Sequence, residues 1–278
     1  MTVAQLQVEA AAALTAGDGL PNPGREARWL LARALGRSEA WLLAHGEEPV
    51  AEAAEALFRA WISRRAAGEP AHYIVGSCPF WGRLFAVTPA VLIPRPETEL
   101  IVECALTVPE PAQPRILDVG TGSGCLAVTL ALEFPGAAVV ATDVSAEAVA
   151  VAAGNARALG ASVRFAAGDL AAHVRGEFDL VVANLPYVPA DEIPGLAVEI
   201  RAHEPHVALA GGEDGADLLR TFMTDLPRLL APGGHAMLEM GPRQRVGLRA
   251  AIAASGLAEV NRGLDHAGLE RVLVLRKR

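Results

Sequence analysis

The segment Arg115-Ile116-Leu117-Asp118-Val119-Gly120-Thr121-Gly122-Ser123-Gly124 carries the clearest indication of the fold class. The apolar residues that end at Val119 predict a buried strand, and those after Gly124 predict a helix over 124–133. Between them the glycines let the backbone turn and approach a ligand closely, because glycine has no side chain and accepts positive φ. A strand, a glycine-rich loop and a helix in this order are typical of a ligand-binding α/β sheet.

Strands and helices alternate along the rest of the chain. We predict strands at 115–119, 138–142, 162–166, 178–183 and 234–239, helices at 145–159, 213–230 and 243–254, and two closing strands near 257–262 and 271–276. This alternation predicts a mostly parallel sheet with helices on both faces.

The first part of the chain has a different pattern. Apolar residues recur at helical spacing up to about Ala67, which predicts four or five short helices with Trp29, Trp41 and Trp61 in their core. Segments 73–76 and 83–87 then read as an antiparallel hairpin. We therefore expect a helical bundle over 1–70, a hairpin linker over 71–94 and a catalytic domain over 95–278.

Composition limits the class of protein. The chain has 278 residues, 52% of them hydrophobic, so one large and one small domain can each bury a core. A formal charge of −8 argues against direct nucleic-acid binding through phosphate contacts. The three cysteines are widely spaced, which indicates a reducing cytoplasm. We find no signal peptide and no membrane-spanning run, and we expect a cytoplasmic monomer.

The glycine-rich loop indicates which ligand it binds. A dinucleotide fingerprint requires a third glycine at the position of Cys125, so the loop suits a smaller nucleoside such as S-adenosylmethionine better than a nicotinamide cofactor. Asp143, at the end of the next strand, can accept hydrogen bonds from both ribose hydroxyls, and Asp118 can meet the ligand's ammonium group. The alternative is that Asp143 only caps the helix that starts at Ser145.

A second motif, Asn184-Leu185-Pro186-Tyr187, closes the strand at 178–183 and is called the corner below. An amide nitrogen is a poor nucleophile, because its lone pair is delocalised, so a transferase must hold its N–H groups and its orientation. The side-chain oxygen of Asn184 and the carbonyl of Leu185 are suitable acceptors, while Pro186 fixes the turn and Tyr187 stacks on the flat amide. The alternative is an ordinary turn at the end of a strand.

A third motif is the segment Leu92-Ile93-Pro94-Arg95-Pro96-Glu97-Thr98-Glu99. Prolines on both sides hold Arg95 in an extended conformation before a helix that starts at about Glu97. We therefore expect Arg95 to have a defined position.

Together these motifs resemble the PrmC/HemK family, the protein-(glutamine-N5) methyltransferases of peptide chain release factors. The resemblance covers about residues 69–241, and its matching segments are Glu69-Pro70, Tyr73-Ile74, Gly76, Phe85-x-Val87, 91–99, 118–124, Asp143, 184–187, Glu204-Pro205, Ala208-Leu209, Gly212-x-Asp214-Gly215 and Glu239-x-Gly241. The segment 93–98 discriminates most, because similar corners also occur in adenine methyltransferases.

The resemblance implies a class I, Rossmann-like methyltransferase domain with a small N-terminal helical bundle that helps to hold the release factor. It implies S-adenosylmethionine as the donor and the glutamine of a Gly-Gly-Gln loop as the acceptor. The implied cofactor-binding residues are Asp118, Gly120, Thr121, Gly122, Ser123, Gly124, Asp143, Asp169, Leu170 and Asn184. The catalytic residues would be Asn184, Leu185, Pro186 and Tyr187, and the substrate-binding residues would be these four with Arg95, Pro96 and Glu97.

The chain departs from the family pattern at two positions. Leu185 replaces the first proline of the usual Asn-Pro-Pro-Tyr, which keeps the carbonyl on which the proposed chemistry depends. Leu170 stands where relatives often have an aromatic residue beside the adenine, so apolar contact would replace stacking there.

Other functions stay open from the sequence. An adenine-N6 or ribosomal-protein glutamine methyltransferase would use a similar corner, and a non-catalytic release-factor or ribosome-binding module could retain the same fold. We expect no metal site, because Pro205 disfavours the continuous helix that would align His203 and His206.

Overall fold

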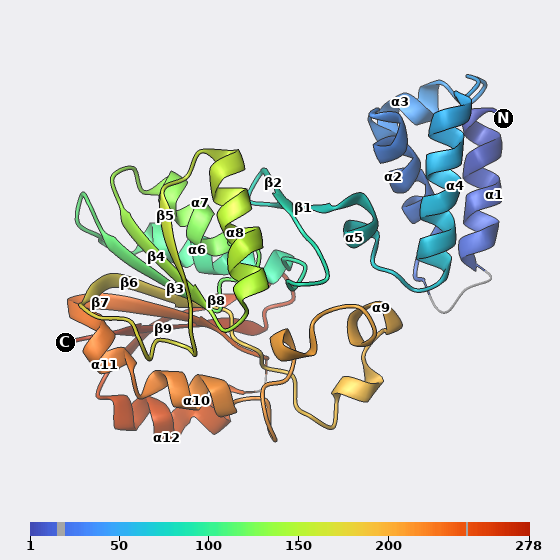
Figure 1. Cartoon of the computed structure of the whole chain (residues 1–278). Coiled ribbons are helices and arrows are strands. Elements are labelled where there is room, and N and C mark those ends of the chain that lie inside the picture. Colours follow the sequence, from blue (N-terminus) through green and yellow to red (C-terminus); the bar gives the residue numbers. More distant parts are fainter. Residues whose placement is uncertain (16–19, 243) are drawn as a thin grey trace. The chain divides into compact units, whose positions relative to one another are not determined.

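The computed structural model describes residues 1–15, 20–242 and 244–278 and divides the chain into two compact units (Figure 1). Met1–Gly76 and Ala197–His203 form the first, here called the helical unit, and Ser77–Leu196 with Glu204–Arg278 form the second, the sheet unit. This division differs from the predicted one in three places. Residues 71–76 belong to the helical unit, the hairpin belongs to the sheet unit, and a short segment from the middle of the chain belongs to the helical unit.

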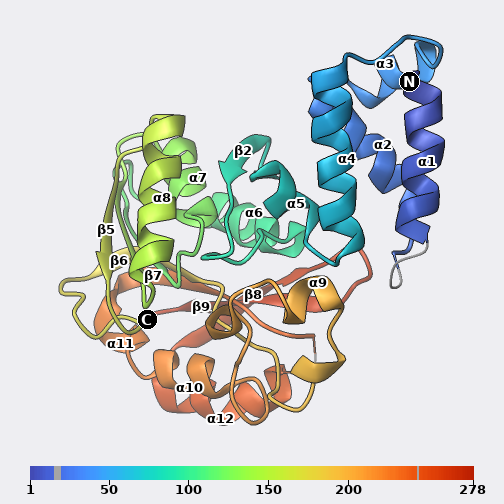
Figure 2. The same cartoon turned by 45° about the vertical axis from the view of Figure 1, so that its right-hand side comes forward.

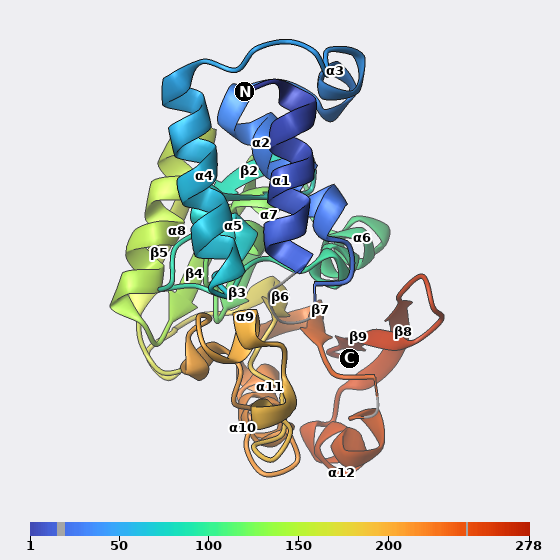
Figure 3. The same cartoon turned by 90° about the vertical axis from the view of Figure 1, so that its right-hand side faces the viewer.

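The helical unit is a small bundle whose long helices lie side by side (Figure 3). Its helices are α1 (Val3–Thr15), α2 (Pro23–Leu35), α3 (Glu39–Ala44), α4 (Glu52–Ala66), α5 (Ala71–Val75) and, from the inserted segment, α9 (Val198–Arg201). Leu6, Leu30 and Phe58 are buried at its centre, and the three tryptophans named above pack against this core partly buried. The helical prediction for this part is therefore confirmed.

The strand predicted at 73–76 is wrong, because these residues form α5 and its C-terminal cap. Tyr73, Ile74 and Val75 have side chains that favour strands, but Tyr73 and Ile74 donate their amides to the Pro70 carbonyl and start a helix. Gly76 ends that helix in the left-handed conformation at φ 77°. The hairpin lies one step later, as β1 (Ser77–Phe80) paired antiparallel with β2 (Arg83–Ala86).

A buried arginine binds the segment Ala197–His203 to the bundle through an ion pair. Arg65 on α4 is 5% exposed and pairs with Glu26 of α2 and Glu199 of α9. A third donor of its guanidinium reaches the Glu69 carbonyl at 3.2 Å. A buried charge needs such partners, so the arginine accounts for the place of α9 in this unit. Nothing in the local sequence pattern indicated this contact.

The sheet unit contains a seven-stranded sheet in the order β5-β4-β3-β6-β7-β9-β8 (Figure 1). The strands are β3 (Arg115–Val119), β4 (Ala138–Asp143), β5 (Val163–Ala167), β6 (Phe178–Ala183), β7 (Leu230–Glu239), β8 (Ala258–Leu264) and β9 (Glu270–Arg276). The pairs among β3 to β7 are parallel, and β9 pairs antiparallel with β7 and β8. The prediction of a mostly parallel sheet is confirmed.

Helices cover both faces of this sheet (Figure 2). One face packs against α6 (Glu99–Thr107), α7 (Cys125–Glu133) and α8 (Ala146–Leu159), and the other against α10 (Asp217–Met223), α11 (Leu226–Leu229) and α12 (Arg245–Ser255). Alternate residues of each strand serve the two faces, so Leu180 packs on the first core and Val181 on the second. The single helix predicted over 213–230 is wrong in extent, since Gly215 lies at φ 77° before α10 begins.

The strand order brings the two sequence motifs together. β3 lies between β4 and β6, and Val119 is in register with Thr142 on one side and Ala183 on the other. The glycine loop after β3 and the corner after β6 therefore leave the same edge of the sheet at neighbouring positions. Three 3-10 turns, Pro96–Thr98, Ile193–Gly195 and His206–Ala208, belong to the loops of this unit.

Candidate active site

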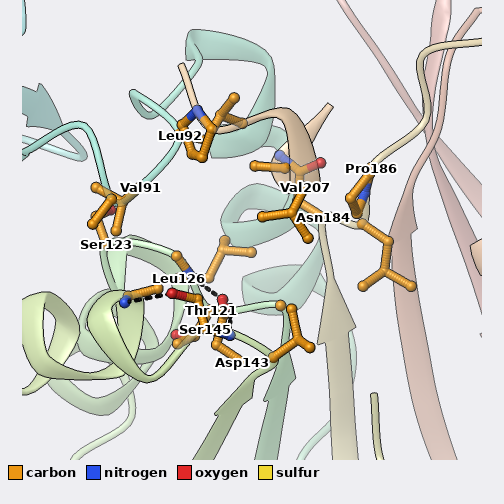
Figure 4. A pocket seen from close by; sticks show the side chains of 18 of the residues that line it. Val91, Leu92, Thr121, Ser123, Leu126, Asp143, Ser145, Asn184, Pro186 and Val207 are labelled. Carbon is orange, nitrogen blue, oxygen red and sulfur yellow. Dashed lines mark hydrogen bonds between the residues drawn. The ribbon is translucent and has the colours of Figure 1, made fainter. Parts of the chain in front are cut away.

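The carboxyl edge of the sheet holds one large pocket, formed within the sheet unit (Figure 4). Asn184 and Pro186 lie on one side of it, and Asp143 and Ser145 on the other. The sequence-predicted residues in its wall are Gly120, Thr121, Gly122, Ser123, Asp143, Asp169, Leu170, Asn184, Leu185 and Pro186. The space among the lining atoms is about 1150 Å³, including the part open to solvent, which is ample for a nucleoside and a second reactant.

Asp143 holds the glycine loop in place by accepting hydrogen bonds from backbone amides. Its Oδ2 accepts the Gly122 amide at 2.8 Å and its Oδ1 accepts the Ser145 amide at 2.9 Å. The following helix has its own cap, because the Ser145 side chain accepts the Ala148 amide. Asp143 is therefore not the N-cap, and each carboxylate oxygen keeps a lone pair for a ligand.

Asp118 lies beneath the loop rather than in the pocket wall. Its side chain has no exposed surface, and Oδ2 accepts the Thr121 hydroxyl at 2.7 Å and the Ala127 amide at 3.2 Å. Burial raises the pKa of this carboxyl to about 7. The expected contact with a ligand's ammonium group does not fit this burial, and the carboxyl instead supports the loop from below. Gly124 is likewise outside the wall, at φ 80° against Ala152.

The glycine loop and the corner touch at Gly120. This residue has φ 74°, and a Cβ placed on it would come within 3.0 Å of Leu185 Cδ2. Leu185 is 3% exposed, its side chain packs against the loop, and the residue also lines the pocket. The residue that replaces the family's first proline thus fills the space between the two motifs.

Asn184 is held in a defined orientation. Its Nδ2 donates to the Thr98 hydroxyl at 2.9 Å, which directs Oδ1 away from that partner. Thr98 was not predicted as a site residue, although it belongs to the third sequence motif. Among the residues that the structure describes, none donates to Asn184 Oδ1 or to the Leu185 carbonyl. Two unused acceptors therefore lie side by side at the end of β6.

The backbone of the corner is fixed by the segment 209–215. Val188 donates to the Leu209 carbonyl at 3.0 Å, and Gly211 donates to the Val188 carbonyl at 2.9 Å. A Cβ on Gly211 would lie 2.6 Å from Tyr187 Cα, so only glycine permits this approach. The sequence shows these glycines, but only the fold shows that they pack against the corner.

Four of the predicted substrate residues, Arg95, Pro96, Glu97 and Tyr187, lie outside the pocket wall. Arg95 donates to the buried Glu204 at 2.6 Å, which confirms that it has a defined place but shows it engaged in an ion pair.

The far side of the pocket is apolar. Leu170 has φ 45°, an uncommon conformation for leucine, and its carbonyl accepts the Thr142 hydroxyl at 3.0 Å. Val144 and Val207 are 59% and 56% exposed and border the same space. Sequence reasoning missed both valines, because a single exposed valine carries no signal until the fold places it beside a pocket.

Two family models match the chain. The PrmC N-terminal domain matches residues 5–76, and the methyltransferase small domain matches residues 97–213. A release factor glutamine methyltransferase of Bordetella pertussis is 47% identical over 262 residues, covering 93% of this chain and 96% of the relative. One from Cereibacter sphaeroides is 43% identical and covers 97% and 96%.

The chain belongs to the release factor glutamine methyltransferase family. Solved structures agree on the fold of its sheet unit. A methyltransferase from Pyrococcus furiosus has a TM-score of 0.55 at 18% identity, covering 71% of this chain and 90% of that one. The ribosomal RNA methyltransferase RsmC of Thermus thermophilus has a TM-score of 0.53 at 21% identity and covers 73% and 50%. The class I, Rossmann-like prediction is confirmed.

In the described parts of the chain, no helix is both long and apolar enough to cross a bilayer. The same residues contain no group of three or more His, Cys, Asp and Glu side chains that could hold a metal ion.

Proposed function

We propose that this enzyme transfers a methyl group from S-adenosylmethionine to the side-chain amide nitrogen of the glutamine in the Gly-Gly-Gln loop of peptide chain release factors. The observation that carries the proposal is the adjacency of β3 and β6, whose carboxyl ends bring the glycine loop and Asn184 into one pocket. Family membership supports the choice of release factor and glutamine as substrate.

The pocket wall suits the donor. Asp143 offers free lone pairs for ribose hydroxyls, and Leu170, Val144 and Val207 form an apolar surface for adenine. Gly122 has φ 53° with nothing within 4 Å of a Cβ position, which leaves its backbone open to a close ligand. The donor supplies a methyl group on a positively charged sulfur, and no metal takes part in this proposal.

The corner suits a primary amide. The two N–H groups of a glutamine side chain match the two unused acceptors, Asn184 Oδ1 and the Leu185 carbonyl. Held there, the nitrogen keeps one orientation while its bond to the methyl carbon forms and the carbon–sulfur bond breaks. The amide proton then leaves to solvent, because the methylated nitrogen is strongly acidic. Orientation of two bound reactants supplies on the order of 7–11 kcal/mol, against roughly 3–4 for one polar contact, so positioning dominates.

The remaining predicted residues act around the glutamine in this proposal. Tyr187 and the Arg95, Pro96 and Glu97 segment would contact the substrate loop beside the pocket. The helical unit would dock the body of the release factor. The enzyme would work as a monomer in the cytoplasm, where release factors are found.

The test is methyl transfer to a purified release factor. With labelled S-adenosylmethionine, the label should appear on the loop glutamine alone, as mapped by mass spectrometry of the digested protein. A release factor with asparagine at that position is the matched control and should stay unlabelled. Label on a ribosomal protein or on adenine, with none on the release factor, would contradict the proposal. Equilibrium dialysis separates a non-catalytic binding module, which should not retain the donor.

A further inference from the structure

A buried carboxylate lies behind the corner and has no role in the chemistry described so far. Glu239 ends β7, next to β6, and is 1% exposed. Neither of its carboxylate oxygens makes a hydrogen bond with a residue that the structure describes. Burying an unpaired carboxylate is costly, so its retention beside the corner calls for a function.

Two hydroxyls affect the ionisation of this carboxylate. Burial raises the pKa of Glu239 to about 7, and the hydroxyls of Thr98 and Tyr187 act to lower it, although neither makes a hydrogen bond of normal geometry with it. The charged groups that face it are Glu97, which raises this pKa, and Arg271, which lowers it. Thr98 is also the acceptor for Asn184 Nδ2. Asn184, Thr98, Glu239 and Tyr187 therefore form one connected set, here called the Glu239 network.

Donor and acceptor chemistry limits the directions that hydrogen bonds in this network can take. A carboxylate only accepts, and a hydroxyl has one proton to give. If Thr98 gives its proton to Glu239, its oxygen can only accept from Asn184. The Asn184 amide must then turn its NH₂ toward Thr98 and its oxygen toward the pocket.

We propose that Glu239 is a positioning residue that accepts from both hydroxyls, and so presents the Asn184 oxygen to the substrate amide and holds Tyr187 beside the pocket. This inference rests on the proposed function. A carboxamide at the same place could accept from one hydroxyl only, because its other end is a donor. Glu239→Gln should therefore remove one of the two hydrogen bonds to the hydroxyls while keeping the volume of the side chain.

The chain offers matched controls for both substitutions. Glu110→Gln changes another carboxyl whose side chain is 5% exposed and whose pKa is also raised to about 7, but which lies beside His235. Thr129→Val removes a fully buried hydroxyl on α7 that has no partner in the described chain. Thr98→Val removes the hydroxyl of the network, and Thr98→Ser retains it.

The experiment is steady-state kinetics of the full chain on a release factor. Glu239→Gln and Thr98→Val should each lower kcat about 10- to 100-fold, with the Kd for S-adenosylmethionine within about twofold of wild type. Thr98→Ser should recover most of the lost rate, and the two controls should match wild type. Because both substitutions break the same network, the double variant should be no slower than the slower single variant.

A pH profile separates orientation from a merely structural role. Protonated Glu239 can no longer accept from both hydroxyls, so wild-type kcat should fall as the pH drops through about 7, and Glu239→Gln should lack that step. Wild-type kcat in Glu239→Gln and Thr98→Val, or losses that multiply in the double variant, would overturn the inference while leaving the proposed function intact. If Glu239→Gln fails to fold, the Thr98→Val and Thr98→Ser pair decides. Absence of methyl transfer by wild type would instead remove the proposed function.

Discussion

Replacement of Asn184 by alanine removes one of the two acceptors that we assign to the substrate amide. The structure shows Asn184 Nδ2 bound to Thr98 at 2.9 Å, with Oδ1 unused by any described donor. Its oxygen is therefore oriented before the substrate arrives, and such a preorganised contact is worth roughly 3–4 kcal/mol in the transition state. We expect kcat to fall about 10²- to 10³-fold.

The same change should have little effect on the donor. Asp143 and Gly122 keep their contact at 2.8 Å on the other side of the pocket, so the Kd for S-adenosylmethionine should change by less than about threefold. Stability should fall by about 1–3 kcal/mol, because the Thr98 hydroxyl loses its donor.

The assay is single-turnover methyl transfer to a release factor, together with equilibrium dialysis of the donor. Asn261→Ala, which removes an exposed asparagine on β8 with a local contact to Arg262, is the control and should keep wild-type kcat. Wild-type turnover in Asn184→Ala would exclude a role for the Asn184 oxygen in holding the substrate amide. So would a variant that loses donor affinity but turns over normally at saturating donor.

Other predictions concern the loop and the buried acids. Asp143→Ala should weaken S-adenosylmethionine binding about tenfold or more, as measured by calorimetry, because the ribose hydroxyls lose their acceptor and the loop loses its contact to Gly122; unchanged affinity would contradict the proposed ribose contact. Gly120→Ala should lower both Tm and kcat, since its Cβ would lie 3.0 Å from Leu185 Cδ2 at φ 74°, whereas Gly256→Ala, at φ 69° with nothing within 4 Å, should lower Tm alone. Loss of kcat in both, or in neither, would contradict this contact. Burial raises the folded-state pKa of Glu239 from 4.5 to about 7. The protonated carboxyl therefore contributes fully to the free energy of unfolding below about pH 4.5, and this contribution is lost as the pH rises through 7. Glu239→Gln should therefore gain stability relative to wild type between pH 5 and 8.5, by up to about 3 kcal/mol in urea unfolding; a constant difference across that range would exclude this titration.

The sequence predicted those parts of the site that short motifs next to an apolar strand make recognisable. The glycine run 120–124 and the corner 184–187 each follow an apolar strand, and the carboxyl ends of parallel strands share one edge of a sheet. Ten of the residues named in advance line the pocket for this reason. The fold class follows from the same alternation of strands and helices.

The residues that the sequence did not predict depend on tertiary contacts. Arg65 and Glu199 are 134 positions apart, and nothing local to either one indicates the ion pair that joins them. Asp118 looked like a ligand-binding acid because it precedes the loop, yet the helix that follows covers it. Thr98 acquires its role only because β6 brings Asn184 beside it.

Local propensity also misled in one place. The side chains of 73–75 favour a strand, but the turn after Pro70 and the left-handed Gly76 enclose them in one short helix. The hairpin strands that follow, Ser77–Phe80 and Arg83–Ala86, pair around Trp81 and Gly82, both at positive φ. The hairpin therefore exists, but its first strand begins at Ser77, and the residues predicted as that strand form a helix instead.

In the proposed enzyme, one pocket holds the donor on the glycine loop and the glutamine amide at the corner. The most direct measurement is a crystal structure of the full chain with S-adenosylhomocysteine and a peptide that carries the Gly-Gly-Gln sequence. We expect the glutamine nitrogen to lie within hydrogen-bonding distance of both Asn184 Oδ1 and the Leu185 carbonyl, facing the sulfur. A glutamine bound elsewhere, or a sulfur on the opposite side of β6, would contradict this arrangement.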